Sequence, residues 1–244
     1  MTQIAFIGGG NMATSIIGGL IREDAVNPDL IHVSDPGEEQ RQRLEADFKV
    51  HTHAENLDAI ANATVVILAV KPQMMKEVLA PLAATLTARQ PLLISVAAGI
   101  SLPTLQAWSG CKAVVRAMPN TPALTGTGAT GLFASDEVSL DQRNLADTLI
   151  GATGIAVWVK TEAEIDAVTA LSGSGPAYYF LMMESMIAAG IKLGLSEDTA
   201  RRLTLQTALG AGKMASASEV APDELRRRVT SPGGTTEKAI ATFE

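Results

Sequence analysis

Hydroxyl residues surround a pair of glycines near the carboxyl end of the chain, in the segment SPGGTT at positions 231–236. A helical pattern follows directly, and backbone N–H groups at the start of a helix attract anions. The glycines permit the backbone conformations that this requires and keep side chains away from a bound anion. An ordinary helix N-cap is the alternative, although it needs only one hydroxyl residue. The segment therefore predicts a binding site for a small carboxylate, formed by Ser231, Gly233, Gly234, Thr235 and Thr236.

A second chemical pattern follows the first apolar run of the chain, at the turn into a predicted helix. Gly8, Gly10 and Ala13 form the sequence G-x-G-x-x-A. The first glycine permits a tight turn, the second lets a pyrophosphate approach the backbone, and the small alanine lets helix and strand pack closely. The free N–H groups of the first helical turn then face the phosphates. This pattern predicts a dinucleotide-binding loop formed by Gly8, Gly9, Gly10, Asn11, Met12 and Ala13.

The choice of nicotinamide coenzyme depends on the end of the second apolar run, where Ser34 or Asp35 is expected to meet the adenosine ribose. An acidic residue at this place favours the 2′-hydroxyl of NAD and repels the 2′-phosphate of NADP. The spacing from Gly10 is long, however, and Asp35-Pro36 is equally well explained as a turn. We find no arginine beside Asp35 to bind a phosphate. The preference between NAD and NADP stays open.

Three further loops follow predicted strands at the same sheet edge, where open α/β sheets bind ligands. One contains Lys71, which is expected either to contact phosphate or to cap the turn. Another holds Asn120 between two prolines, and such a rigid loop suits the nicotinamide end of a coenzyme. These loops add to the predicted coenzyme site Ala69, Val70, Lys71, Pro72, Ala97 and Asn120.

The elements that must position these residues alternate in the first part of the chain. Apolar, β-branched runs at 4–7, 31–34, 64–70, 92–96 and 113–116 are separated by helical patterns that include 12–22, 38–48 and 74–86. Two more strands are expected at 129–134 and 155–159. Apolar strands that alternate with helices indicate a parallel sheet covered on both faces. We therefore expect an α/β Rossmann-type dinucleotide-binding domain over residues 1–160.

From residue 161 onward the patterns predict only helices, at 162–171, 176–193, 197–217, 222–229 and 236–244. Pro176 suits a first helical turn and Ser196 suits an N-cap. The two long helices carry few charges, so burial on nearly every side is expected. Because about 80 residues cannot bury that much apolar surface alone, residues 161–244 are predicted to be an all-α domain that forms a homodimer and binds substrate.

Composition excludes several other classes of protein. A net charge of −7 and the absence of a basic stripe argue against nucleic-acid binding. The single cysteine, Cys111, suits a reducing compartment and is expected to be a small apolar residue near a strand end. No signal peptide is expected, and the longest apolar run, 177–195, contains Glu184 and Lys192, so no membrane span is predicted. These features predict a cytoplasmic protein.

His32, His51 and His53 are expected to be strand or surface residues, and no metal site is predicted.

The segments FIGGGNMA, AVKPQ, RAMPNTPALTGTGATGL, ALSGSGPAYYF and VTSPGGTTEKAIATFE together resemble the pyrroline-5-carboxylate reductase family of proline biosynthesis. The similarity covers essentially the whole chain in order, and the last segment is the most specific. The resemblance implies NAD(P)H-dependent reduction of L-1-pyrroline-5-carboxylate to L-proline. It also implies a helical dimerisation domain and higher assembly, commonly decameric. Family members usually continue a little past the final helix, whereas this sequence stops at Glu244.

The resemblance also assigns individual residues. It implies that Ser34 and Asn56 contact the coenzyme, together with positions 8–13 and 69–72. It implies that the carboxylate segment binds the substrate, with Thr236 as the donor near the ring nitrogen, and less securely that Glu219 lies on the substrate side. The active site is expected to form between the coenzyme loops and a helical domain, of the same chain or of a partner subunit.

The absence of acid–base residues favours an imine as substrate. Related β-hydroxyacid dehydrogenases have a lysine four residues after a comparable G-x-G segment, where this chain has Tyr179 after Gly175. An alcohol–carbonyl reaction needs a general acid–base, whereas a protonated cyclic imine accepts hydride directly. Catalysis would then be mostly orientation of the reactants. The alternatives are another imine or β-hydroxyacid oxidoreductase of this architecture, or a dinucleotide-sensing protein without activity.

Overall fold

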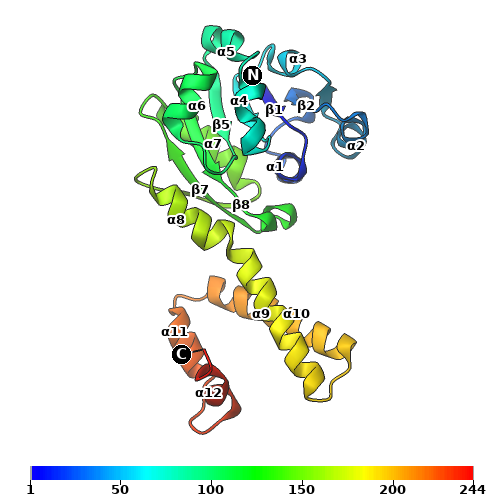
Figure 1. Cartoon of the computed structure of the whole chain (residues 1–244), viewed down its shortest axis with the longest axis vertical. Coiled ribbons are helices and arrows are strands. Elements are labelled where there is room, and N and C mark those ends of the chain that lie inside the picture. Colours follow the sequence, from blue (N-terminus) through cyan, green and yellow to red (C-terminus); the bar gives the residue numbers. More distant parts are fainter. Residues whose placement is uncertain (1, 244) are drawn as a thin grey trace. The chain divides into compact units, whose positions relative to one another are not determined.

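The computed structural model describes residues 2–243 and is shown in Figure 1. Its contacts divide the chain into two compact units, Met1–Pro176 and Ala177–Glu244. We describe each unit by itself. Glu244, at which the predicted final helix ends, lies outside the described residues.

The first unit is built around one eight-stranded sheet with the order β3-β2-β1-β4-β5-β6-β7-β8. Its strands are β1 (Ile4–Ile7), β2 (Ile31–Ser34), β3 (His51–His53), β4 (Val65–Leu68), β5 (Leu92–Ser95), β6 (Val114–Met118), β7 (Gly128–Ala134) and β8 (Gly154–Trp158). The predicted α/β, Rossmann-type class is confirmed. Every strand predicted from the sequence is present, and β3 is an additional strand.

One pair of strands departs from the expected parallel sheet, because β7 runs antiparallel to β6. The remaining neighbours, including β7 and β8, pair in parallel. A parallel neighbour needs a crossover connection, which is usually a helix. The link between β6 and β7 holds only the short 3-10 helix η3 (Thr121–Thr125), so β7 returns in the opposite direction.

The helices of the first unit are α1 (Asn11–Arg22), α2 (Glu38–Phe48), α3 (Asn56–Ile60), α4 (Met75–Leu79), α5 (Ala83–Arg89), α6 (Leu102–Ser109), α7 (Leu140–Gly151) and α8 (Glu164–Val168). The helix predicted over 74–86 is in fact two, α4 and α5, because Pro81 lies between them and cannot continue the hydrogen-bond ladder. A π-helix, η4 (Thr169–Gly173), follows α8 where a single helix was expected.

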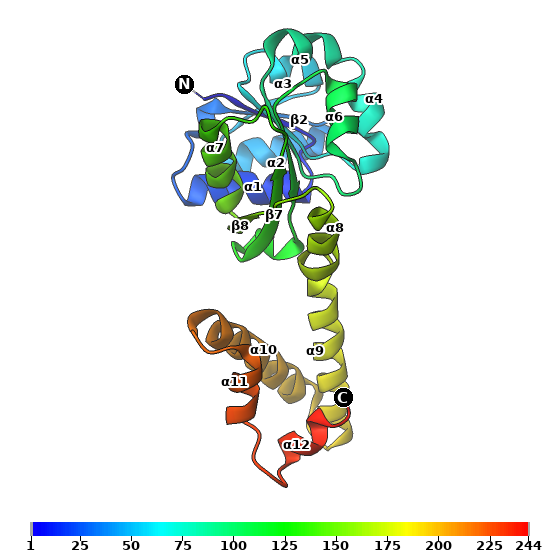
Figure 2. The same ribbon diagram turned by 90° about the vertical axis from the view of Figure 1, so that its left-hand side faces the viewer.

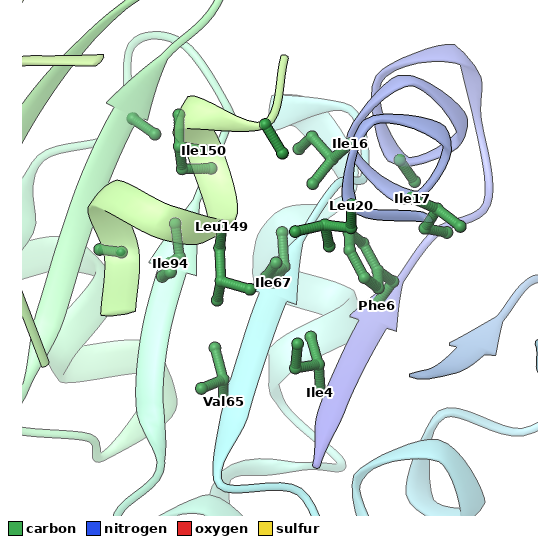
Figure 3. Close-up of a cluster of buried hydrophobic side chains, with 14 of the residues drawn as sticks. Ile4, Phe6, Ile16, Ile17, Leu20, Val65, Ile67, Ile94, Leu149 and Ile150 are labelled. Carbon is green, nitrogen blue, oxygen red and sulfur yellow. The ribbon is translucent and has the colours of Figure 1, made fainter. Parts of the chain in front are cut away.

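Helices cover both faces of the sheet, as Figure 2 shows for α1 and α7 on one side and α4 and α6 on the other. Alternate residues of β1 enter two separate cores, so Ile4 and Phe6 face one and Ala5 and Ile7 face the other, and β4, β5 and β6 alternate in the same way. Figure 3 shows the first core, in which β1, β4 and β5 pack against α1 and α7. Each fully buried side chain of this size contributes roughly 1.5–3 kcal/mol. The carboxyl ends of the strands, from which the ligand loops emerge, are therefore held rigidly by the packed cores.

The second unit is helical, as predicted, and consists of the greater part of α9 (Gly175–Lys192) with α10 (Glu197–Ala217), α11 (Pro222–Arg228) and α12 (Thr235–Ile240). Ser196 is the predicted N-cap of α10, and its Oγ accepts a hydrogen bond from Thr199 N at 3.2 Å. Among the described residues of this unit, only Ala200 and Thr204 are buried.

The long helices of this unit expose large apolar side chains along their length. Tyr179 in α9 is 69% exposed and Met214 in α10 is 62% exposed. The sequence predicts that these helices are buried, and a single chain does not bury them. Monomeric proteins rarely expose continuous apolar surface of this extent, so it marks an interaction surface.

The remaining observations concern features away from the ligand loops. Cys111 is buried, and burial raises the pKa of its thiol to about 11, so the thiol stays protonated and unreactive. The described residues contain no cluster of histidine, cysteine and carboxylate side chains that could hold a metal ion. Within the same described part of the chain, no helix is long and apolar enough to cross a membrane.

Candidate active site

The site is built first by Gly8, at the end of the central strand β1. Its φ of +94° is a conformation that side chains disfavour, and a Cβ at this position would lie 2.9 Å from the carbonyl oxygen of Ala69. The Ala69 N–H in turn donates to Ile7 O at 2.8 Å. The strand order reverses between β1 and β4, and such a switch point is where α/β sheets bind ligands. Gly8 and Ala69 therefore meet at the predicted coenzyme site.

The start of α1 is open to a ligand. Gly10 is its N-cap, no side chain caps it, and a Cβ added at Gly10 would meet nothing within 4 Å. Asn11 is exposed and Met12 is partly exposed, while Ala13 is fully buried against the sheet, as the glycine pattern requires. N–H groups of a first helical turn have no partner inside the helix. The residues present therefore fit a dinucleotide pyrophosphate.

The loop after β2 is tied to the glycine loop by the carboxylate of Asp35. One carboxylate oxygen accepts a hydrogen bond from Gly9 N and the other from Gly37 N, each at 2.9 Å. Asp35 is thus both a turn residue and a charged residue beside the glycine loop, the two explanations that the sequence left open. Ser34 differs, because it is fully buried and its Oγ donates to Phe6 O at 3.3 Å.

The sequence-based statement that no arginine stands beside Asp35 is wrong. Arg41 lies one turn into α2, and its Nη1 donates to the carbonyl oxygens of Asp35 at 2.8 Å and of Pro36 at 3.0 Å. The side chain folds back over the loop, which six residues of separation in the sequence do not reveal. A cation and an anion therefore both lie at the predicted adenosine end of the site.

Five other predicted coenzyme residues follow strands at the same end of the sheet. Asn56 is the first residue of α3 and is partly exposed. Lys71 follows β4 and is exposed, and it makes no side-chain hydrogen bond or ion pair within residues 2–243. Ala97 follows β5, and its N–H donates to Ser95 Oγ at 3.3 Å. Val70 and Pro72 flank Lys71 and are partly exposed.

Asn120 is nearly buried, and both ends of its carboxamide are occupied by the protein. Its Nδ2 donates to Ser172 O at 3.0 Å, and its Oδ1 accepts from Ala129 N at 2.9 Å. The side chain therefore holds the loop after β6 against β7 and η4. If a coenzyme contacts Asn120, the contact would therefore be made by the backbone of this residue and not by its side chain.

The carboxylate segment forms the turn that starts α12. Gly233 has a φ of +72°, which explains the first glycine, and Gly234 is the N-cap. The hydroxyl residues Ser231, Thr235 and Thr236 are exposed, and Glu219 is exposed as well.

Not all N–H groups of this segment are free, contrary to the expectation from the sequence. Gly234 N donates to Ser231 O at 3.0 Å, and Gly233 N donates to the carboxylate of Glu237 at 2.7 Å. Pro232 has no N–H group to offer. Glu237 was not singled out from the sequence, although a glutamate four residues beyond a glycine turn can reach back to it. A carboxylate of the chain itself thus occupies part of the predicted carboxylate site.

Two family models match different parts of the chain. Residues 162–244 match the family model described as "Pyrroline-5-carboxylate reductase dimerisation", and residues 3–99 match "NADP oxidoreductase coenzyme F420-dependent". The C-terminal match identifies a dimerisation domain. The N-terminal match covers the glycine loop and the ends of β1 to β5.

Two relatives that are similar over nearly the whole chain carry the same description. A pyrroline-5-carboxylate reductase of Pseudomonas aeruginosa is 57% identical over 99% of this chain and 88% of its own length. One of Haemophilus influenzae is 50% identical over 99% of this chain and 89% of its own.

Solved structures show the same similarity in three dimensions. A pyrroline-5-carboxylate reductase of Coxiella burnetii has a TM-score of 0.93 and 45% identity, covering 99% of this chain and 90% of the other. A pyrroline carboxylate reductase of Plasmodium falciparum with NADP bound has a TM-score of 0.86 and 28% identity, covering 99% and 88%. The chain belongs to the pyrroline-5-carboxylate reductase family and is an NAD(P)H-dependent oxidoreductase.

Proposed function

We propose that this protein reduces L-1-pyrroline-5-carboxylate to L-proline with NAD(P)H, the last step of proline biosynthesis. The observation that carries the proposal is the start of α1, which is uncapped and has open space above Gly10 at the switch point of the sheet. Such a helix terminus binds a dinucleotide pyrophosphate, and family membership supplies the substrate.

The coenzyme is held along the carboxyl edge of the sheet in this proposal. The N–H groups of Gly10, Asn11 and Met12 bind the pyrophosphate, while Gly8, Gly9 and Ala13 shape the turn. Asp35, Asn56 and the backbone of Ser34 line the adenosine side. The loops after β4, β5 and β6 enclose the nicotinamide side, which adds Ala69, Val70, Lys71, Pro72, Ala97 and Asn120. Bound NAD(P)H supplies the hydride that is added to C5 of the pyrroline ring.

The substrate is bound by the segment before α12. N–H groups of Thr235 and Thr236 and the hydroxyl of Ser231 face its carboxylate, and Gly233 and Gly234 leave room for it. Glu219 belongs to the substrate side in this proposal. The hydroxyl of Thr236 donates to the ring nitrogen, which must carry a proton before C5 can accept hydride. Because the imine nitrogen takes that proton from Thr236 or from solvent, no histidine or lysine is needed as a general acid.

The exposed apolar faces of α9 and α10 support a homodimer through these helices, since a second copy would cover them. Assembly of such dimers into a decamer and a cytoplasmic location remain our proposals. The single cysteine is compatible with a reducing compartment.

The test is oxidation of NADH and of NADPH by the purified protein, with and without L-1-pyrroline-5-carboxylate, next to a panel of other cyclic imines and of the carbonyl compounds to which β-hydroxyacids are oxidised. We expect turnover with pyrroline-5-carboxylate and with neither these carbonyl compounds nor coenzyme alone. Thr236→Ala should lower kcat/KM by about 10- to 100-fold, and Thr236→Ser should restore most of it. Binding of coenzyme without turnover of any imine would overturn the proposal.

A further inference from the structure

An ion pair between a buried arginine and a partly exposed glutamate joins three segments of the first unit away from the residues assigned so far. Arg116 lies within strand β6 and is 6% exposed, and its Nη1 lies 2.6 Å from Glu162 Oε1. The same carboxylate oxygen accepts a hydrogen bond from the backbone N–H of Leu102, also at 2.6 Å. We call these three groups the Arg116–Glu162 junction.

The Arg116–Glu162 junction lies next to two of the ligand loops, those after β5 and β6. Leu102 is the first residue of α6, five positions after Ala97, so its N–H is held where the loop after β5 ends. Arg116 is paired in register with Ser95, the last residue of β5, and precedes Asn120 by four positions. One carboxylate oxygen therefore fixes the end of one nicotinamide-side loop and the strand from which the other emerges.

A second set of contacts joins the same stretch of chain to the loop after β6. Asn120 Nδ2 donates to Ser172 O at 3.0 Å, and a Cβ at Gly173 would lie 2.8 Å from Met118 Cε. Ser172 and Gly173 both belong to η4, which follows Glu162 after the short helix α8. The segment that begins at Glu162 thus supports this loop at two separate points.

The chemistry of the pair is poorly suited to a purely stabilising role. Within the described part of the chain, Arg116 Nε is buried and has no hydrogen-bond partner. An ion pair with a buried partner often stabilises a protein no more than well-packed apolar residues would, because the buried charge, here that of Arg116, must leave water. A strand interior that needed only stability would be filled by apolar side chains, as at Val114 and Val115 on either core.

We propose that Arg116 and Glu162 are positioning residues for the reaction: they hold the loops after β5 and β6 in the relative placement that aligns the nicotinamide end of the coenzyme. This rests on the coenzyme placement under the proposed function. Neither residue touches a reactant in this proposal. The pyrophosphate loop after β1 does not depend on the junction, so coenzyme affinity and turnover should separate.

The first test uses single variants. Glu162→Gln keeps an acceptor for Leu102 N but removes the charge that holds Arg116, and Arg116→Met removes the guanidinium with little loss of volume. We expect kcat to fall about 10- to 100-fold, since displacements near 1 Å have that effect. KM for NAD(P)H should change less than about threefold, since the interactions removed are not those that bind the coenzyme.

The second test separates positioning from stability. The double variant Arg116→Met, Glu162→Gln leaves no unpaired charge and keeps an acceptor for the Leu102 N–H, so its melting temperature should return to near that of the wild type while kcat stays low. Arg43→Met, which breaks the exposed pair with Asp47, is the matched control and should leave both quantities unchanged.

The outcomes are distinct. A double variant with wild-type kcat would overturn the proposal, and so would single variants whose melting temperature falls while kcat is kept. If a single variant does not fold, the double variant alone decides by the same criterion. A wild-type protein that does not reduce pyrroline-5-carboxylate contradicts the proposed function instead, and coenzyme binding measured by fluorescence then still tests whether the pyrophosphate loop is independent of the junction.

Discussion

Asp35 Oδ2 accepts a hydrogen bond at 2.9 Å from the N–H of Gly9, so one carboxylate ties the end of β2 to the glycine loop after β1. This places a negative charge at the adenosine end of the proposed coenzyme site, and the guanidinium of Arg41, which reaches back from α2, is hydrogen-bonded to the same loop. The two charges should act in opposite directions on a coenzyme that carries a 2′-phosphate.

Asp35→Asn should therefore shift the coenzyme preference toward NADPH. Loss of one nearby charge is worth about 1–2 kcal/mol at a solvated site, so the ratio of kcat/KM for NADPH over NADH should rise about 5- to 30-fold. Arg41→Met should shift the same ratio in the opposite direction. Steady-state kinetics with both coenzymes measure it, with Glu39→Gln on the exposed side of α2 as a control. An unchanged ratio in both variants would show that the ribose lies elsewhere.

Gly10 and Gly8 should respond differently to substitution although they lie two residues apart. A side chain at Gly10 meets open space, so Gly10→Val should keep the melting temperature within a few degrees and lose most coenzyme affinity. Gly8→Ala forces a Cβ against Ala69 O at a φ of +94°. It should cost about 1–3 kcal/mol of folding free energy. Thermal unfolding and titration of NADPH fluorescence distinguish the two effects. Tight binding by the Gly10 variant would refute the pyrophosphate assignment.

Glu237 should oppose substrate binding, because its carboxylate already accepts the Gly233 N–H that a substrate carboxylate would use. Glu237→Gln removes the charge and keeps an acceptor for the turn. We expect KM for pyrroline-5-carboxylate to fall about 2- to 10-fold through relief of like-charge repulsion. KM for the coenzyme should not change. Glu197→Gln, at the exposed start of α10, serves as a control for a general effect of charge. A rise in KM would mean that Glu237 builds the site instead of competing for it.

His32 should make the protein less stable in acid. Burial, and then the neighbouring His51 and His53, lower its pKa below 6.5, so the unfolded chain binds a proton more readily than the folded chain. The stability that this group contributes is present above pH 6.5 and is lost as the pH falls through its lowered value. Denaturant unfolding from pH 8 to pH 5 should show this slope, and His32→Gln should reduce it. An identical slope in the variant would assign the pH dependence to other groups.

The alternation of apolar runs and helical patterns was sufficient to predict the sheet, because strands buried on both faces must be apolar along their whole length. β3 was not predicted in this way, because its sequence His-Thr-His is short and polar. The strand lies at the edge of the sheet and so does not need to be apolar along its whole length. The antiparallel return of β7 also could not be read from its composition, since strand direction depends on the connection and not on the residues of the strand.

The site was predictable where a backbone conformation demands a residue type, as at Gly8 and Gly233. The site was not predictable where its arrangement depends on a contact made by a long side chain. Arg41 reaches back to the loop after β2, Glu237 reaches back to Gly233, and Glu162 meets Arg116 across 46 positions. Such contacts depend on rotamers and on tertiary packing, and neither leaves a periodic trace in the sequence.

The exposed apolar helices of the second unit make the amount of protein present a factor in its own folding. If only another copy can cover those side chains, then dilution acts on this chain much as a denaturant does, by mass action. Subunits carrying different substitutions would also assemble with one another, so a substitution that destabilises one copy would lower the stability of its partner as well.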